Sequence, residues 1–427
     1  MSASPANPPT LAAKSLGLLA LVNDVPAPEE VVGGEQIRPY EFVRWLEARG
    51  IESTVWCLRA TRRRNEIRGT VRIRSLGAFA PGLIREVFLI PVVGLVIVCA
   101  ALRARTLGHE LVLWARVPAG VTWKWGLPIL GDPSFLYFGL ARRLGVHVWA
   151  TNHDISPEHE ADKNAQQRDV GVRNTAAFRN AVRSGRAQSL IQNFGLPRAS
   201  VVTAVSDGTR AELVRRYRLR PETTGIVRAG VDPSAYAGLA PWSPPDGPWR
   251  IAYLGGAADA DASLLLTTLR AIGANESVSV TLMGRGFDRF DRTLLPEGLD
   301  VAIRSDVRYE DLPSVAADVD VWLVPLGTTG YHAWAWPLKV PMYLASGRPV
   351  VITDHPEVTA AGVSPYVYAT VPSEADGLAR GLRDVFRDPD EACRRADAGR
   401  RFALTELTWD RQFEEGLRLL AKAGSAE

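Results

Sequence analysis

Lys339 is the side chain in this sequence best placed to meet an anion. It stands in the first turn of an apolar helix that we expect to begin at Pro337 and to close at Gly347, before a buried strand over 349–353. The free N–H groups and the dipole of a helix N-terminus attract phosphate, and an ammonium group beside them adds a point charge. The alternative is a surface lysine on an ordinary helix.

Glycines follow several of the expected strands. Gly33 and Gly34 come after the first strand, Gly255 and Gly256 after a later one, and Arg285 lies between two further glycines. Adjacent glycines let backbone N–H groups approach a phosphate or a sugar closely, and the planar arginine fork binds phosphate oxygens in pairs. Simple turns with an exposed arginine are the alternative. The spacing is not the GxGxxG of nicotinamide binders.

Two further positions follow expected strands and carry reactive side chains. His153 and Asp154 come directly after a strand, where the histidine can donate a hydrogen bond or accept a proton. A structural histidine explains the same position equally well. Ser206 precedes another helix, and we interpret it as a helix cap first and a ligand contact second.

Aromatic side chains surround the lysine segment. His332, Trp334 and Trp336 precede Lys339, and Trp123 with Trp125 forms a second alternating pair in the first half of the chain. Alternating tryptophans can stack on a base, a sugar or a lipid. Packing in the core is their commoner use.

The elements that must position these residues follow one pattern throughout. Strand-like runs alternate with helical patterns, which predicts parallel sheets covered by helices on both faces, that is, an α/β fold with two doubly wound Rossmann-like domains facing across a cleft. Ligands in such sheets bind at the carboxyl ends of the strands. The expected strands cover 16–22, 53–58, 111–115, 146–151, 201–205, 250–254, 277–283, 301–304, 319–324 and 349–353.

A proline-rich break divides the chain. Residues 237–249 interrupt all periodicity and predict a linker. We expect an N-terminal Rossmann-like domain over 1–236 and a C-terminal Rossmann-like domain over 250–405. The amphipathic segment within 406–427 is expected to form a helix that packs back across the junction.

Composition describes an ordinary soluble protein of two domains. The chain has 427 residues, of which 46% are hydrophobic and 23% charged, with a net charge of +3. Cys57, Cys99 and Cys393 are few and far apart, which indicates a reducing, cytoplasmic location and neither a zinc site nor a disulfide framework. We expect no nucleic-acid partner.

Basic and apolar residues adjoin each other early in the chain. Arginines crowd the segment from Arg59 to Arg74, and the apolar run Val87 to Leu102 follows it. That run is shorter than the roughly 18 residues that suggest a spanning helix. Docking on an anionic membrane surface, at the inner face of the plasma membrane, would suit the combination. The alternative is a buried helix.

Taken together, these segments resemble the two-domain GT-B glycosyltransferases, and most of all glycosyltransferase family 4. The resemblance covers most of residues 16 to 420 and is carried, in the family's order, by GGEQIRPYEFVRWLEARG, ARRLGVHVWATNHDISP, VVTAVSDGTRAELVRRY, GIVRAGVDPSAY, RIAYLGG, VTLMGRG, YEDLPSVAADVDVWLVPL, PLKVPMYLASGRPVV and TWDRQFEEGLRLL.

The resemblance implies transfer of a sugar from a nucleotide diphosphate donor, held by the second domain, to an acceptor held by the first. Retention of the anomeric configuration and independence of metal ions are expected with it. By analogy, Gly33 and Gly34 lie near the donor phosphates or the acceptor, His153 near the sugar, and Lys339 with Arg285 near the diphosphate. A lipid-linked saccharide and a small natural product are the acceptors considered. An inverting reaction would make Asp154 the preferred base.

The chain departs from the family at its sugar and ribose contacts. Trp334 and Met342 occupy the positions of two customary glutamates, and the usual cations after Gly256 are missing. Ala229 also replaces a customary asparagine. Because of these losses, two alternative functions stay open. One is a catalytically impaired relative that acts as a partner subunit, and the other is a sugar-nucleotide epimerase or a phosphorylase of the same fold.

Overall fold

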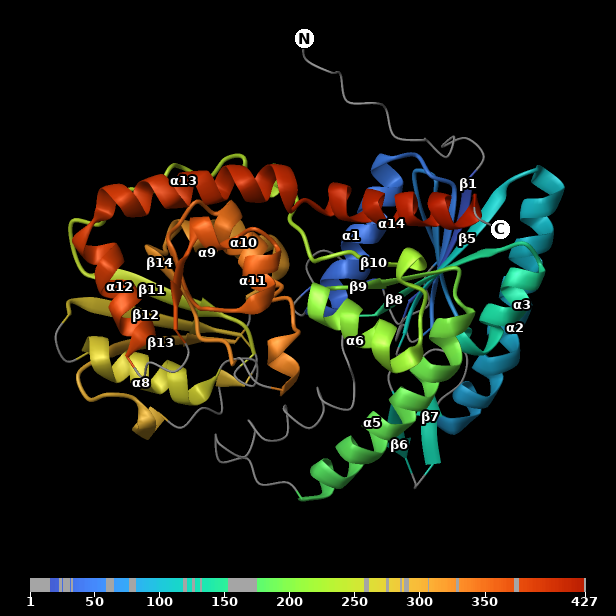
Figure 1. Ribbon diagram of the computed structural model, residues 1–427, viewed down its shortest axis with the longest axis horizontal. Helices are drawn as coiled ribbons and strands as arrows, with labels where there is room; N and C mark the ends of the chain where they lie inside the picture. Colours follow the sequence, from blue (N-terminus) through green and yellow to red (C-terminus); the bar gives the residue numbers. More distant parts are fainter. Residues whose placement is uncertain are drawn as a thin grey trace, which may run out of the picture.

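Two parallel sheets, each covered by helices, lie side by side in the computed structural model (Figure 1). The described residues are 16–22, 25, 31, 34–58, 65–76, 82–117, 121–124, 127–130, 133–152, 175–256, 261–273, 276–284, 286–287, 292–305, 307–327, 330–371 and 376–425.

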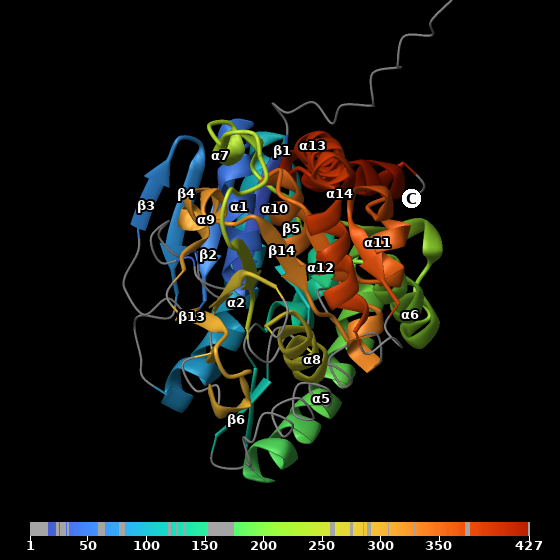
Figure 2. The same cartoon turned by 90° about the vertical axis from the view of Figure 1, so that its left-hand side faces the viewer.

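The first sheet is parallel except at one edge. Its neighbouring strands are β10 (Thr224–Ile226), β9 (Val201–Ala204), β8 (His147–Asn152), β5 (Glu110–Arg116), β1 (Leu16–Val22), β2 (Ser53–Cys57), β4 (Val71–Ser75) and β3 (Asn65–Arg68). Only β3 runs antiparallel within it, against β4. The pair lies at the margin of the molecule (Figure 2), and it was not expected from the sequence. A separate two-stranded ribbon joins β6 (Val121–Lys124) to β7 (Leu127–Leu130).

The second sheet is parallel throughout its described strands. Its order is β13 (Asp300–Arg304), β12 (Val278–Met283), β11 (Trp249–Leu254), β14 (Val321–Val324), β15 (Val350–Thr353) and β16 (Tyr368–Thr370). All of the strands expected from the sequence are present, with ends shifted by at most a few residues. Their runs of buried β-branched residues suit strands covered on both faces, which is why they could be located from sequence alone.

Helices occupy the connections between strands. Those of the first half are α1 (Gly34–Ala48), α2 (Gly82–Leu107), η3 (Ser134–Tyr137), α3 (Phe138–Arg143), α5 (Thr175–Gly195), η4 (Leu196–Arg198), α6 (Asp207–Tyr217), η5 (Pro221–Thr223) and α7 (Pro233–Tyr236). Those of the second half are α8 (Ala262–Gly273), η7 (Arg292–Leu294), η8 (Tyr309–Asp311), α9 (Leu312–Ala317), η9 (Gly330–Ala333), α10 (Lys339–Ala345), α11 (Pro356–Ala360), η10 (Ser364–Tyr366), α12 (Gly377–Arg387), α13 (Pro389–Glu406) and α14 (Trp409–Gly424).

α14 returns from the second domain to the first. Figure 1 shows it continuing the line of α13 and crossing onto the first sheet. The ring of Phe413 packs edge-on against Phe42 of α1 at 5.0 Å between centroids, and Trp45 Nε1 donates to Asp410 at 3.0 Å. Thr408 caps the helix by accepting the N–H of Arg411. The last helix therefore ties the two halves of the chain together.

The apolar helix is longer than the sequence suggested. The run 87–102 lies inside α2, which extends from Gly82 to Leu107 because arginine-bearing turns continue it at both ends. Within it, Phe88–Leu107 is long and apolar enough to cross a membrane by length and composition, and 33% of an 18-residue apolar stretch of it is buried in the protein. The expectation that the helix falls short of spanning length was therefore wrong.

Candidate functional site

β11 and β12 end in glycine turns that touch each other at the carboxyl edge of the second sheet. The N–H of Gly255 donates to Met283 O at 2.9 Å, and the N–H of Gly284 donates to Arg304 O at 2.8 Å. A Cβ on Gly284 would overlap the carbonyl oxygen of Gly255, and φ at Gly284 is 122°. Only glycine fits there, because any side chain would push the two turns apart.

Lys339 lies directly over this turn. Its Nζ donates to the hydroxyl of Tyr253 at 2.8 Å and sits 4.2 Å from the centre of the Tyr253 ring. A Cβ on Gly255 would overlap the same Nζ atom. The side chain is only 9% exposed. The ammonium is therefore held in one place by a hydrogen bond and a cation–π contact.

The helix behind Lys339 differs from the expected one. Pro337 begins a turn, its carbonyl accepting from Val340 at 3.1 Å, and α10 itself starts at Lys339 and spans 7 residues. Gly347, with φ of 67°, follows the helix as expected. Because α10 is so short, its dipole adds little, and attraction of an anion rests on the ammonium group and the glycine turn.

Tyr343 fixes α10 to the end of β11. Its hydroxyl accepts from Leu254 N at 2.7 Å and donates to Leu254 O at 3.0 Å. The ring stacks on Trp322 of β14 at 4.1 Å, and burial raises the pKa of Tyr343 far above its ordinary value. The strand end that carries Tyr253 and the helix that carries Lys339 are thus locked together.

A buried histidine positions the loop before Lys339. His355 Nδ1 accepts the N–H of Glu357 at 3.2 Å, so its Nε2 carries the proton and donates to His332 O at 2.5 Å. Burial is the main cause that lowers the pKa of His355 below its ordinary value. A neutral His355 therefore holds the backbone of His332 at the edge of the second sheet.

The tryptophans near Lys339 contact the other domain. The carbonyl of Trp334 accepts from Thr209 Oγ1 at 3.1 Å and from Ser206 Oγ, and Trp336 Nε1 donates to Ala229 O at 3.4 Å. Trp336 is 7% exposed and packs in the protein, and the side chain of Trp334 lies against Gly208 of α6. The assignment of Trp334 to donor binding stays a prediction.

Met342 lies in the hydrophobic core and is 6% exposed. A thioether in that place offers an apolar surface only, so this position cannot replace the hydrogen bonds of a carboxylate. Met342 therefore packs in the core in this structure, and its assignment to donor binding stays a prediction.

Ser206 acts as a helix cap and as a contact between domains. Its Oγ accepts the N–H of Thr209 at 3.1 Å. The two N–H groups between them, of Asp207 and Gly208, donate to the Glu357 carboxylate at 2.9 and 2.7 Å. The Glu357 carboxylate accepts from the N-terminus of α6, so Ser206 takes part in an interdomain contact, and its role in a phosphate loop stays a prediction.

The first domain contributes cations that were not expected from the sequence. Arg116 ends β5 at the carboxyl edge of the first sheet, in register with Thr151 of β8. Arg38 of α1 is buried, and its Nη2 donates to Val227 O at 2.9 Å. Burial, then the charge of Arg116, lowers the pKa of Arg38 to about 9. An arginine at the end of an apolar strand is the signal that could have indicated this cluster.

Several expected site residues lie outside the described residues: Gly33, His153, Asp154 and Arg285. Gly34 is described and begins α1 after β1, as expected. Tyr253, the partner of Lys339, was missed by sequence reasoning. Its position two residues before Gly255 at a strand end is the signal that could have indicated it.

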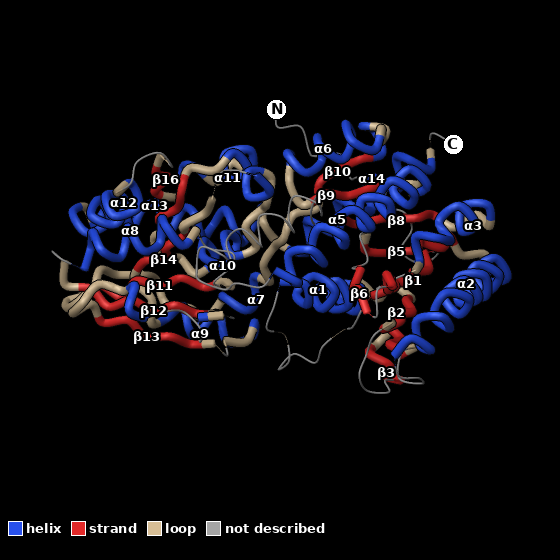
Figure 3. The backbone as a smooth tube through the Cα atoms, turned by 90° about the horizontal axis from the view of Figure 1, so that it is seen from below, coloured by secondary structure: helices blue, strands red, loops and turns tan. Residues whose placement is uncertain are grey.

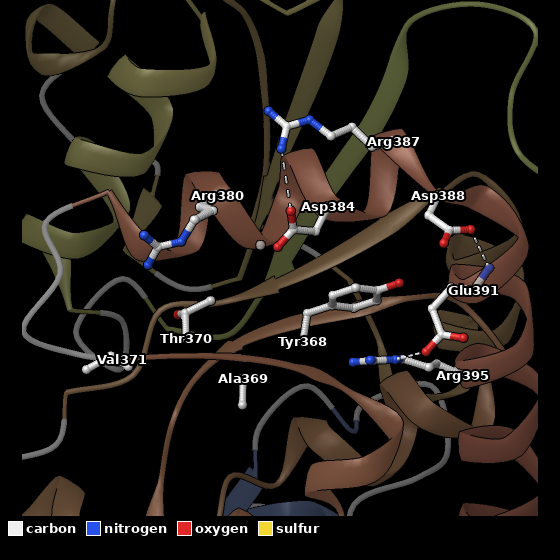
Figure 4. Close-up of a pocket in the computed structure, with 11 residues that line it drawn as sticks. Tyr368, Ala369, Thr370, Val371, Arg380, Asp384, Arg387, Asp388, Glu391 and Arg395 are labelled. Atoms are coloured by element: carbon white, nitrogen blue, oxygen red, sulfur yellow. Dashed lines mark hydrogen bonds and ion pairs between the residues drawn. The ribbon is translucent and has the colours of Figure 1, made fainter.

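A surface hollow elsewhere in the second domain has no part in this arrangement. It is lined by β16, α12 and α13, and Figure 4 shows its charged side chains pairing with one another, Arg395 with Glu391 and Arg387 with Asp384. None of the expected site residues lines it. Within the described part of the chain, no cluster of three or more His, Cys, Asp or Glu side chains could hold a metal ion.

Comparison with known proteins agrees with this architecture. Residues 129–235 match the model of Glycosyltransferase Family 4. Sucrose-phosphate synthase from Thermosynechococcus elongatus superposes with a TM-score of 0.64 at 16% identity, over 96% of this chain and 100% of that one. HepE from Anabaena in complex with UDP-glucose gives 0.61 at 14%, over 96% and 100%.

A third structure, the α,α-trehalose 6-phosphate synthase of Burkholderia multivorans, gives a TM-score of 0.59 at 10% identity, over 96% of this chain and 99% of that one. No curated protein sequence matches the chain. The expected fold class is confirmed: the chain has the two-domain GT-B fold of glycosyltransferases, and its residues 129–235 match Glycosyltransferase Family 4.

Proposed function

We propose that the protein is a glycosyltransferase that moves a sugar from a nucleoside diphosphate donor to an acceptor hydroxyl. The observation that carries the proposal is the Lys339 ammonium, held by Tyr253 over the Gly255 turn at the carboxyl edge of the second sheet. Ligands of doubly wound sheets bind at this edge. The family match and the fold likeness to HepE with bound UDP-glucose support the same conclusion.

In this mechanism the donor diphosphate lies against the glycine turns. As the bond between the anomeric carbon and the phosphate oxygen breaks, negative charge grows on the leaving diphosphate. Lys339 stabilises that charge, and because Tyr253 already fixes it, little reorganisation is needed at the moment of reaction. Arg285, which follows Gly284 in the chain, is proposed to bind the same diphosphate.

The acceptor binds on the side of the first domain. Its hydroxyl oxygen forms the new bond to the anomeric carbon on the face that the phosphate leaves, which retains the configuration. The hydroxyl proton passes to the departing phosphate oxygen, so no dedicated base is required. His153, next in the chain after β8, is proposed to contact the sugar, and Asp154 would serve as base only in an inverting reaction.

One experiment identifies the nucleotide of the donor. The protein is titrated calorimetrically with UDP, GDP, ADP and dTDP, and then incubated with the matching diphosphate sugars while mass spectrometry follows sugar release and transfer. We expect one nucleoside diphosphate to bind far more tightly than the others, with activity unchanged by EDTA. Loss of activity in EDTA would refute the metal-independent form of the mechanism.

A second function is favoured by one observation. Trp334 and Met342 stand where the family carries glutamates, and they engage the other domain and the core instead. These substitutions suit a non-catalytic subunit that has kept the fold. If none of the nucleoside diphosphates binds, this second function replaces the first.

A further inference from the structure

The helix α2 presents an apolar face to solvent. Phe88, Leu95 and Leu102 are 62%, 62% and 53% exposed, and the exposed Pro91 and Cys99 continue the same stripe at helical spacing. Large apolar side chains on the surface of a soluble protein usually occur singly. A continuous stripe along a helix therefore marks a contact surface.

The opposite face of α2 is bound to the protein. Val93, Ile97, Ala101 and Ala104 are buried in the cluster beneath the first sheet. The ring of Tyr137 lies where a Cβ on Gly94 would be, and the Tyr137 hydroxyl donates to Ile90 O at 2.7 Å. A helix packed along one whole side cannot be surrounded by lipid, so its length alone does not make it a spanning segment.

Neighbouring elements extend the apolar face. Leu136 and Leu140 of η3 and α3 are 38% and 40% exposed, on the same helical face as the exposed Arg143. In α5, Leu190 and Phe194 are also exposed, and Phe194 packs edge-on against Phe135 of η3. The helices that cover one face of the first sheet thus expose apolar side chains on their outer side.

The described charged side chains of α2, η3, α3 and α5 are all basic. Residues 87–109 contain Arg103 and Arg105, both exposed near the end of α2, and no aspartate or glutamate. Neither η3 with α3 nor α5 contains an acidic residue, although α3 has Arg142 and Arg143. Apolar groups bordered by arginines fit the headgroup region of an anionic bilayer, where guanidinium groups meet phosphates and apolar side chains enter the acyl boundary.

The edge of the first sheet formed by β3 and β4 contributes side chains to the same surface. Val71 and Ile73 of β4 face the other core cluster, so the alternating Arg72 and Arg74 point toward the side that α2 covers. Ile67 of β3, 73% exposed, pairs in register with Arg72 and shares its face. Part of the basic segment noted in the sequence is thus on the same face of the sheet as α2.

We infer that this surface, formed by the outer side of α2 with η3, α3 and the β3–β4 margin, docks the protein on an anionic lipid bilayer. α2 and α3 lie at the end of the molecule away from the second domain (Figure 3), so docking leaves the donor domain free in solution. The helix lies in the plane of the interface and is not inserted across it. The inference concerns location and is independent of the proposed transfer reaction.

The test uses the full chain and vesicles of defined composition. Flotation is measured with phosphatidylcholine vesicles and with vesicles containing 30% phosphatidylglycerol, at about 50 and 500 mM salt. The variants are Leu95→Glu with Leu102→Glu, and separately Arg103→Glu with Arg105→Glu. Val371→Glu, at an exposed apolar residue of the second domain, is the matched control.

We expect the wild type and the control to float with anionic vesicles at low salt, and both double variants to lose at least tenfold of that binding. Thermal unfolding and gel filtration of each variant show whether it is folded. The inference is overturned if folded wild type does not bind anionic vesicles, or if both double variants bind as the wild type does. It is also overturned if the apolar pair only converts a dimer to a monomer, because a second copy then covers the face.

Discussion

The chemistry proposed for the site depends on how one ammonium group is held. Lys339 is nearly buried, and its described contacts are the hydroxyl and the ring face of Tyr253. Both fix the position of the lysine Nζ over a turn whose backbone approaches closely because it has no side chain. A fixed cation favours a diphosphate more strongly than a mobile surface lysine does, since no conformational entropy is lost on binding.

Replacing Lys339 by methionine should therefore abolish most of the donor turnover. The unbranched methionine keeps the buried volume and removes the charge, so we expect kcat/KM for the donor to fall by about 100-fold to 1,000-fold with the fold intact. Initial rates and thermal unfolding measure this. Lys422→Met, at an exposed residue near the end of α14, is the control. A near-native rate in Lys339→Met would remove this residue from the site.

Tyr253→Phe tests the support of the lysine. The variant keeps the ring under the ammonium and loses the 2.8 Å hydrogen bond, so the lysine becomes less well positioned. We expect the affinity for the nucleoside diphosphate to weaken by about 3- to 10-fold, as for loss of one hydrogen bond. Calorimetry measures it, with Tyr368→Phe on the edge strand β16 as control. Equal affinities in the two variants would show that the hydroxyl has no positioning role.

At the scale of elements, the glycine turns set the shape of the proposed donor site. Gly284→Ala should separate the turns after β11 and β12, because the added Cβ overlaps the Gly255 carbonyl. We expect nucleoside diphosphate binding to be lost and the unfolding free energy to fall by roughly 1–3 kcal/mol. Gly238→Ala is the control, since no atom lies within 4 Å of a Cβ there. Unchanged binding in Gly284→Ala would exclude a role of this turn in the site.

The element boundaries show which local signals failed. Pro337 suits a first helical position, but it begins a separate turn, and α10 tolerates Pro341 because that residue lies in the first turn, where its missing N–H has no acceptor. In α2, arginines extend the helix beyond the apolar run, since arginine is a good helix former. Hydrophobic pattern located the elements, whereas propensity and packing set their ends.

At the scale of the whole molecule, Glu357 joins the two domains. Its carboxylate accepts the first N–H groups of α6 from the other domain, a charge-assisted contact at a helix N-terminus. We expect Glu357→Ala to lower the unfolding free energy by about 1–3 kcal/mol and to speed hydrogen exchange at the start of α6. Glu297→Ala, at an exposed acid of the same domain, is the control. Unchanged exchange would show that the contact is not maintained in solution.

Glu41 makes stability depend on pH. Burial is the main cause that raises its pKa to about 7, above the value of 4.5 in the unfolded chain. The folded state therefore binds more protons between about pH 4.5 and 7, so stability falls as pH rises through that window and is level above it. The Glu41→Gln variant should lack this fall. The unfolding free energy of the variant minus that of the wild type should therefore rise by up to about 3 kcal/mol between pH 4.5 and pH 8.

Urea unfolding at a series of pH values measures this difference, with Glu297→Gln as the control for an exposed acid. Parallel pH profiles for the wild type and Glu41→Gln would contradict the raised pKa. The effect belongs to the whole molecule, because Glu41 lies among groups from separate parts of the chain: Arg44 of α1, Asp232 before α7 and Tyr309 of the second domain.

The sequence by itself determined the α/β class, most of the strands of both sheets and the glycine turns at their carboxyl ends. These features are local: a buried strand needs a run of apolar residues and a tight turn needs glycine, wherever the rest of the chain lies. Lys339 could likewise be singled out, because its neighbours in sequence place it at a helix start.

Only the tertiary structure decided what each of these residues touches. Tyr253 meets Lys339 across 86 positions of sequence, and Glu357 meets Gly208 across 149. Exposure of one side of α2 likewise depends on which strands the other side covers. Such contacts arise from the packing of distant elements, and no local pattern of residue types specifies them.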